Sequence, residues 1–179
     1  YEPYITKSIV SFVGQMMIDN KQSDIAKENG LLPFDLLALE PIRTICEKIM
    51  SLVRFSYSEN PLDDLKKKIR HIYDLHQLLR QKEFLDFIHS TAFDDMLLKV
   101  ANDDVISFKN NNKWLIHHPL EALIFKSLET VWSELRTIYS GDFKSLVYGE
   151  LPKEEAVLET LKMIHDRLNT ISWTIKIAN

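Results

Sequence analysis

The sequence predicts a mainly α-helical protein, a helical bundle with one short β element. Only 4 Gly and 6 Pro occur among 179 residues, so long stretches are free to form helices. Apolar residues recur at three- and four-residue steps through most of the chain, which is the spacing of one helix face. One short apolar run between two prolines departs from this spacing and fits a strand. The composition, 45% hydrophobic and 27% charged, is typical of a soluble globular protein with its own core.

The first 40 residues combine helical and extended signals. Residues 4 to 28 carry apolar side chains at helical spacing, and a polar run leads from them to Gly30, which suits the position just after a helix. We expect one or two helices in this segment. Residues 33 to 39 are apolar and lie between Pro33 and Pro41, so we expect a brief strand. This strand would pack at the edge of a sheet built mostly by residues outside this chain.

The strongest helix signals come next, in two consecutive segments. Pro41 suits the first turn of a helix, and one apolar stripe continues from it to about Tyr57. Asn60 and Pro61 then restart the chain, and a second stripe continues to about Arg80. The connection between the two segments is short, so the two helices should lie side by side.

The remaining residues predict further helices separated by one clear loop. We expect two shorter helices between residues 82 and 108, a polar loop at 109 to 113, and a helix from Pro119 to near Gly141. A last helix begins near Leu151, with acidic residues close to the positive end of its dipole. Its apolar stripe continues through Ile171 and Ile175.

The composition excludes several classes of protein. Cys46 is the only cysteine, so no internal disulfide can form, and no zinc-finger spacing exists. No run approaches the roughly 18 apolar residues of a membrane span, and no signal peptide is evident, so we expect no membrane partner and a cytoplasmic location. The net charge of −4 gives no overall basic field for nucleic acid, although residues 66 to 71 form a local basic cluster.

Polar residues on the helix at 41 to 57 are the first candidates for a site. Arg43, Glu47, Ser51 and Arg54 share a polar face of this helix. Lys48 instead borders the apolar stripe, where a lysine must reach solvent or meet an anion.

The helix at 61 to 80 carries matching candidates. Arg70 and Asp74 lie one turn apart and can pair, so two adjacent helices can present Lys48, Arg70 and Asp74 to one groove. The alternative is a set of surface ion pairs, each worth at most about 1 kcal/mol. Spacing alone leaves both interpretations open.

Two ordered motifs carry a resemblance to a known family. Residues 47 to 54 read Glu-Lys-Ile-Met-Ser-Leu-Val-Arg, and residues 70 to 75 read Arg-His-Ile-Tyr-Asp-Leu. The first is similar to the Glu-Lys-Leu-x-Ala-Leu-x-x-Arg motif of the AbiEii/AbiGii nucleotidyltransferase toxin family, with Arg54 one position early. The second is similar to the basic-Asp-x-Tyr-Asp-Leu motif of that family, with His71 in place of the first acid. The chain therefore resembles the carboxyl-terminal part of that family, most clearly over residues 33 to 80.

The resemblance implies a polymerase-β-like nucleotidyltransferase core followed by helices. Residues 1–40 would then be the tail of the core, and residues 41–179 the C-terminal helical domain. The family motifs imply that Lys48 holds nucleotide phosphate and that Asp74 is required for activity. Glu47, Arg54, Arg70 and Tyr73 match the flanking nucleotide-binding positions.

The same resemblance implies an activity, cofactors and partners. The parent protein would transfer a nucleotidyl group from a nucleoside triphosphate, with Mg²⁺, to an RNA such as tRNA or to a protein acceptor. It would act as a toxin in a toxin-antitoxin or phage abortive-infection system, together with a cognate antitoxin. The required Gly-Ser turn and paired metal-binding aspartates are absent from this sequence, so we expect them before Tyr1. We expect this chain alone to be inactive and to bind no cofactor.

Two other functions stay open on the sequence. Arg70 and His76 have the Arg-x5-His spacing of HEPN-type ribonucleases, which cleave RNA without metal. A non-enzymatic helical interaction module is the second alternative. The pair at His117 and His118 lacks further ligands at metal-binding spacing, and the acidic pairs at 63–64, 94–95 and 103–104 suit helix starts and solvent-facing positions. The three tryptophans suit packing in the core.

Overall fold

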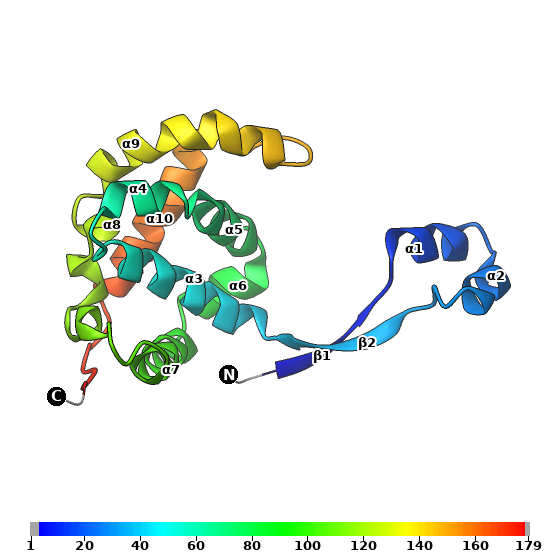
Figure 1. Cartoon of the computed structure of the whole chain (residues 1–179), viewed down its shortest axis with the longest axis horizontal. Coiled ribbons are helices and arrows are strands. Elements are labelled where there is room, and N and C mark those ends of the chain that lie inside the picture. Colours follow the sequence, from blue (N-terminus) through cyan, green and yellow to red (C-terminus); the bar gives the residue numbers. More distant parts are fainter. Residues whose placement is uncertain (1–3, 178–179) are drawn as a thin grey trace. The chain divides into compact units, whose positions relative to one another are not determined.

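A computed structural model describes residues 4 to 177 of the chain. Among these residues it contains ten α-helices and one two-stranded sheet, which confirms a mainly α fold with a short β element (Figure 1). The chain divides into two compact units, with the division after Pro41. No helix among the described residues is long and apolar enough to cross a membrane.

The first unit contains the sheet. Strand β1 (Tyr4–Ile9) pairs antiparallel with strand β2 (Phe34–Leu39), so that Tyr4 lies opposite Leu39. The predicted strand at residues 33 to 39 is confirmed. The predicted helical start at residue 4 is wrong, because the Tyr-Ile-Thr run that opens β1 favours extended backbone and finds a partner strand in β2.

Two short helices connect these strands. α1 (Phe12–Asp19) begins where the Ser11 hydroxyl accepts the Gly14 N–H at 3.0 Å. Gly14 is required because a Cβ there would lie 2.1 Å from the Leu31 carbonyl oxygen. α2 (Ser23–Glu28) ends at Gly30 with a φ of 64°, and the Leu31 N–H donates to the Ala26 carbonyl. This is a Schellman ending, so the predicted role of Gly30 is confirmed.

The second unit is a helical bundle around one core. α3 (Pro41–Phe55) buries the predicted stripe, and Ile45, Ile49 and Leu52 have no exposed surface. Each large apolar side chain buried in this way contributes about 1.5 to 3 kcal/mol. α10 (Glu154–Leu168), drawn in orange in Figure 1, packs against both α5 (Ile69–Leu79) and α9 (Leu128–Ser140). Two of the three tryptophans, Trp114 and Trp132, lie within this core as expected.

Further helices complete the bundle. The other α-helices are α4 (Pro61–Lys66), α6 (Lys82–Ile88), α7 (Thr91–Ser107) and α8 (Leu123–Lys126). Three 3-10 helices are η1 (Lys113–Ile116), η2 (Pro119–Glu121) and η3 (Asp142–Leu146). The two helices predicted between residues 82 and 108 are confirmed as α6 and α7.

Three predicted helices are shorter or more divided than their apolar stripes suggest. The segment from Pro61 to Arg80 forms two helices, because the chain tightens at Lys68, whose N–H donates to Leu65 rather than four residues back. The segment from Pro119 to Gly141 forms η2, α8 and α9. The last helix ends at Leu168, and the extended residues after it are held by side chains. The Trp173 indole, for example, donates to the Leu115 carbonyl at 2.8 Å.

A long-range hydrogen bond accompanies the division before α8. Ala122 is extended, and the Ile124 N–H donates to the buried Ser56 hydroxyl at 3.1 Å. The N–H therefore has a partner outside its own helix, which removes one reason for a helix to continue through this point.

Candidate functional site

The two motif segments lie on neighbouring helices, α3 and α5. Lys48 on α3 places Nζ 2.7 Å from Oδ2 of Asp74 on α5. The lysine and aspartate side chains are 17% and 25% exposed, so the pair is largely sheltered from solvent. The lysine that borders the apolar stripe of α3 therefore meets an anion. The predicted contact between these two helices is present through this ion pair, although few of their backbone positions lie close together.

Arg70 lies on the exposed side of this ion pair. Its Nε lies 3.8 Å from Oδ2 of Asp74, and its side chain is 80% exposed. The predicted one-turn pairing is present, but a solvated guanidinium at this distance contributes little to stability. Asp74 thus has one close, sheltered cation and one distant, solvated cation.

A neutral histidine completes this cluster. Nδ1 of His71 lies 3.5 Å from Nζ of Lys48. An ammonium group has only hydrogen-bond donors, so Nδ1 carries the lone pair and the ring proton belongs on Nε2. Burial, followed by the charges of Lys48 and Lys68, lowers the pKa of His71 to about 4, which keeps the ring neutral at pH 7.

A second ion cluster links α3 to α7. Arg43 is fully buried, and its guanidinium lies 2.8 Å from a carboxylate oxygen of Glu47 and 2.8 Å from one of Asp103. The predicted solvent-facing role of Asp103 is wrong, because Asp103 faces α3 and forms an ion pair with the buried Arg43. Glu47, a predicted site residue, is therefore held in place by Arg43.

Arg54 and Asp104 lie close to this second cluster. The Arg54 guanidinium stacks over the rings of Phe108 and Phe55, at 4.1 and 4.9 Å from their centroids. Burial raises the pKa of Asp104 to about 6, although the positive charge of Arg54 opposes that rise. Asp104, like Asp103, is partly covered rather than freely solvated.

Tyr73 occupies a different side of α5. Its ring packs edge-on against Phe143, with centroids 5.3 Å apart, and it lies against the hydrophobic core. The structure therefore brings Lys48, Arg70 and Asp74 together, with His71 beside them, and places Tyr73 in the packing behind them.

The ribonuclease alternative is not assembled. His76 is buried, and its Nδ1 lies 2.8 Å from the Thr160 hydroxyl on α10, whereas Arg70 points to solvent. The two residues cannot act on one phosphodiester in this arrangement. His118 is likewise structural, because its two ring nitrogens contact the Leu120 N–H and the Ile171 carbonyl.

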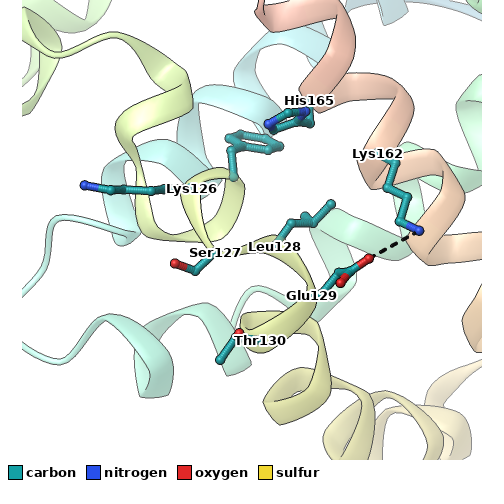
Figure 2. A pocket seen from close by; sticks show the side chains of 8 residues that line it. Lys126, Ser127, Leu128, Glu129, Thr130, Lys162 and His165 are labelled. Atoms are coloured by element: carbon teal, nitrogen blue, oxygen red, sulfur yellow. Dashed lines mark ion pairs between the residues drawn. The ribbon is translucent and has the colours of Figure 1, made fainter.

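A surface hollow elsewhere in the second unit offers a weaker candidate. It is lined by residues 125 to 130 together with Lys162 and His165 from α10 (Figure 2). Lys162 lies 3.5 Å from Glu129 and also pairs with Glu159, so its charge is already balanced. In Figure 2, Lys126 points away from the other labelled cation. The hollow therefore lacks converging groups for one ligand.

The Lys48 cluster is suited to bind an anion. Lys48, Arg54 and Lys68 are all close enough to lower the pKa of His71, and Asp74 is the carboxylate among its charged neighbours. The positive charges exceed the negative charge around a neutral ring, which favours a phosphate group. Within residues 4 to 177, no three histidine, cysteine, aspartate or glutamate side chains converge.

Sequence reasoning missed three contributors to the two clusters. Arg43 and Asp103 are separated by 60 residues, and no local pattern connects them. His71 was visible only as a departure from the motif, and its contact with Lys48 depends on how α3 and α5 pack. The position of Lys48 at the edge of an apolar stripe was the signal that predicted an anionic partner from another helix.

Comparison with known proteins agrees with these motifs. A family model described as nucleotidyl transferase AbiEii toxin, of a type IV toxin-antitoxin system, matches residues 3–162. The matched range covers most of both units and includes both motif segments. No curated protein and no solved structure matches the chain.

Proposed function

The chain belongs to the AbiEii nucleotidyl transferase toxin family, and on this basis we propose that it forms the helical side of a nucleotidyltransferase active site. The proposed reaction moves a nucleotidyl group from a nucleoside triphosphate to an RNA or protein acceptor. A polymerase-β-like core would supply the Gly-Ser turn and the carboxylates that hold Mg²⁺. A cognate antitoxin would control the activity in the cytoplasm, as part of a toxin-antitoxin or phage abortive-infection system.

The observation that carries the proposal is the meeting of Lys48 and Asp74. They come from two motif segments on different helices and share a sheltered contact of 2.7 Å. Asp74 fixes the direction of the lysine side chain, because a carboxylate this close restricts a flexible ammonium. Two of the three Lys48 N–H groups face Asp74 and His71, and in this proposal the third donates to the ligand.

The chemistry of nucleotidyl transfer needs such a positioned cation. Negative charge grows on the departing phosphates as the bond to the transferred group breaks, and a fixed ammonium stabilises that charge. In this proposal Lys48 contacts phosphate, and Asp74 acts as its positioning residue. Arg70 adds positive charge on the exposed side of the Lys48–Asp74 pair, and Arg54 and Glu47 extend the polar surface along α3. Tyr73 holds α5 in place through its packing against Phe143.

The test compares two lysine variants in the intact parent protein. Lys48→Ala should lower nucleotidyl transfer at least about tenfold, since losing one positioned charge costs several kcal/mol in preorganised sites. Lys67→Ala is the matched control, because Lys67 is 72% exposed and pairs only locally with Asp64. It should leave transfer nearly unchanged. Thermal melting checks that both variants fold.

Equal, near-wild-type transfer by both variants would contradict the role of Lys48. That result would favour the non-enzymatic interaction module instead. Loss of transfer in both would indicate a diffuse effect of positive charge rather than a defined contact.

A further inference from the structure

His71 contributes a hydrogen-bond donor that the proposed function does not yet use. Its Nδ1 faces the Lys48 ammonium, so the proton belongs on Nε2, on the other side of the ring. Within the described residues the only hydrogen-bond partner found for the His71 ring is Lys48. No fully buried side-chain nitrogen or oxygen in that part of the chain lacks a partner, so Nε2 keeps some surface exposed to solvent.

The charges around the ring favour an anionic ligand at this donor. Lys48 and Arg54 on α3, and Lys68 at the start of α5, each act on His71 with positive charge. Asp74 on α5 supplies the opposing negative charge, and its oxygen Oδ2 is engaged by Lys48. The charges around the ring are therefore positive overall, and the ring itself is a neutral donor among them.

The placement of the donors also limits the size of the ligand. Nδ1 and Nε2 lie on opposite sides of the imidazole, so Nε2 points away from the Lys48 ammonium that contacts Nδ1. The oxygens of one phosphate group lie too close together to accept from both of these diverging donors. Two phosphate groups joined in a chain can do so, because each can meet a different donor.

We infer that His71 is a second phosphate-binding residue, whose Nε2–H donates to one phosphate group of a polyphosphate while Lys48 contacts another. The inference deepens the proposed function and rests on the phosphate-binding role of Lys48. It assigns the ligand class as the polyphosphate chain of a nucleoside triphosphate rather than a single phosphate. His71 stands where the family motif has an acid, so the inference gives this position a binding role that depends on an imidazole ring instead of a carboxylate.

The inference requires inorganic tripolyphosphate to bind the 179-residue chain itself, in contrast to the expectation that this chain alone binds no cofactor. Calorimetric titration should show binding by the wild-type chain, and inorganic phosphate should bind at least about tenfold more weakly because it reaches one donor only. His71→Gln keeps an acceptor for Lys48 but moves the donor, and it should weaken tripolyphosphate binding at least about fivefold. Lys67→Ala, the matched control, should bind like the wild type.

An NMR titration of the wild-type chain gives a second readout that a purely structural histidine would not show. The imidazole signals of His71 should shift on addition of tripolyphosphate, and the pKa of His71 should rise because a bound anion favours the charged ring. This measurement remains informative if the His71 variant folds poorly.

The outcomes distinguish the proposed role of His71 from the proposed role of Lys48. Wild-type affinity in His71→Gln, with an unmoved His71 signal and with weakened binding in Lys48→Ala, would overturn the role of His71 and leave that of Lys48 intact. Equal affinity in Lys48→Ala and wild type would overturn both. Absence of wild-type binding up to about 10 mM tripolyphosphate would also overturn both, since even a weak site should be occupied at that concentration.

Discussion

Nζ of Lys48 lies 2.7 Å from Oδ2 of Asp74, a residue 26 positions later in the chain. This contact is the point at which the two motif segments meet. Each segment alone is an amphipathic helix with charged residues, which is a common pattern on protein surfaces. The sheltered ion pair distinguishes these two helices, because it places a cation and its anchor where a surface pair would be solvated.

The first prediction concerns the coupling between these two side chains. Lys48→Met and Asp74→Asn should each destabilise the chain by about 1 to 2 kcal/mol, and the double variant should lose less than their sum. The pair is mostly sheltered, so a coupling energy of about 1 kcal/mol should remain even in 0.5 M salt, where exposed pairs are screened. Urea unfolding of the four proteins measures it. A coupling near zero would show that the pair is effectively solvated.

The second prediction concerns the buried Arg43. Its carboxylate partners Glu47 and Asp103 are 31% and 35% exposed, so they can regain water if the arginine is removed. Arg43→Met should therefore cost only about 1 to 2 kcal/mol. Glu47→Gln combined with Asp103→Asn removes both of these carboxylates from the buried cation and should cost about 3 to 5 kcal/mol. Chemical denaturation gives both values. The reverse order would mean that Arg43 stabilises the fold chiefly through its own packing.

The third prediction concerns the hydrogen bond at the start of α8. Ser56→Ala removes the acceptor of the buried Ile124 N–H and should cost about 1 to 3 kcal/mol, the usual penalty for an unsatisfied buried group. Ser133→Ala on the exposed face of α9 is the control and should change stability by less than about 0.5 kcal/mol. Thermal melting compares the two variants. An equally small loss for both would show that water replaces the Ser56 hydroxyl.

Local sequence signals predicted the elements whose ends depend on nearby residues. α3 begins at Pro41 and buries one stripe, and α2 ends at Gly30 with a positive φ, because proline and glycine act through their own backbone preferences. Two residues of the candidate site could also be predicted from local signals. Lys48 could be singled out because it borders an apolar stripe, and Asp74 because it ends the second motif.

Signals that depend on distant residues were not visible. The division before α8 involves Ser56, which is 68 residues from Ile124, and β1 depends on pairing with β2 about 30 residues away. Both segments have apolar spacing that also fits a helix. The Arg43 and Asp103 contact is hidden in the same way, since a charged face that another helix covers has the same pattern as a solvated one.

The last prediction uses the opposite pKa shifts of Asp104 and His71. Burial raises the pKa of Asp104 from 3.8 to about 6, so between these pH values the folded state binds more protons than the unfolded state. The Asp104 contribution to stability is therefore greatest at low pH and falls as pH rises toward 6. Burial and nearby cations lower the pKa of His71 from 6.5 to about 4, so its contribution rises with pH over the range from 4 to 6.5.

The two contributions should largely cancel in the wild-type chain between pH 4 and 6. Asp104→Asn removes the Asp104 contribution and leaves that of His71. The stability of this variant relative to wild type should therefore increase by about 1 to 2 kcal/mol from pH 4 to pH 6. This range is reduced to allow for the partial exposure of both groups. His71→Gln should show the opposite trend with a similar size. Urea midpoints at half-unit pH steps give these differences, and other titrating groups cancel because they are common to all the proteins.

The double variant provides the decisive comparison. Neither group is among the charges that shift the pKa of the other, so the effects of the two substitutions should add. The double variant should then match the wild-type pH profile in this range, displaced by a constant amount. A profile for either single variant that runs parallel to the wild type would show that the substituted group has the same pKa in the folded and unfolded chain. Solvent would then reach that group more freely than its packing between the helices indicates.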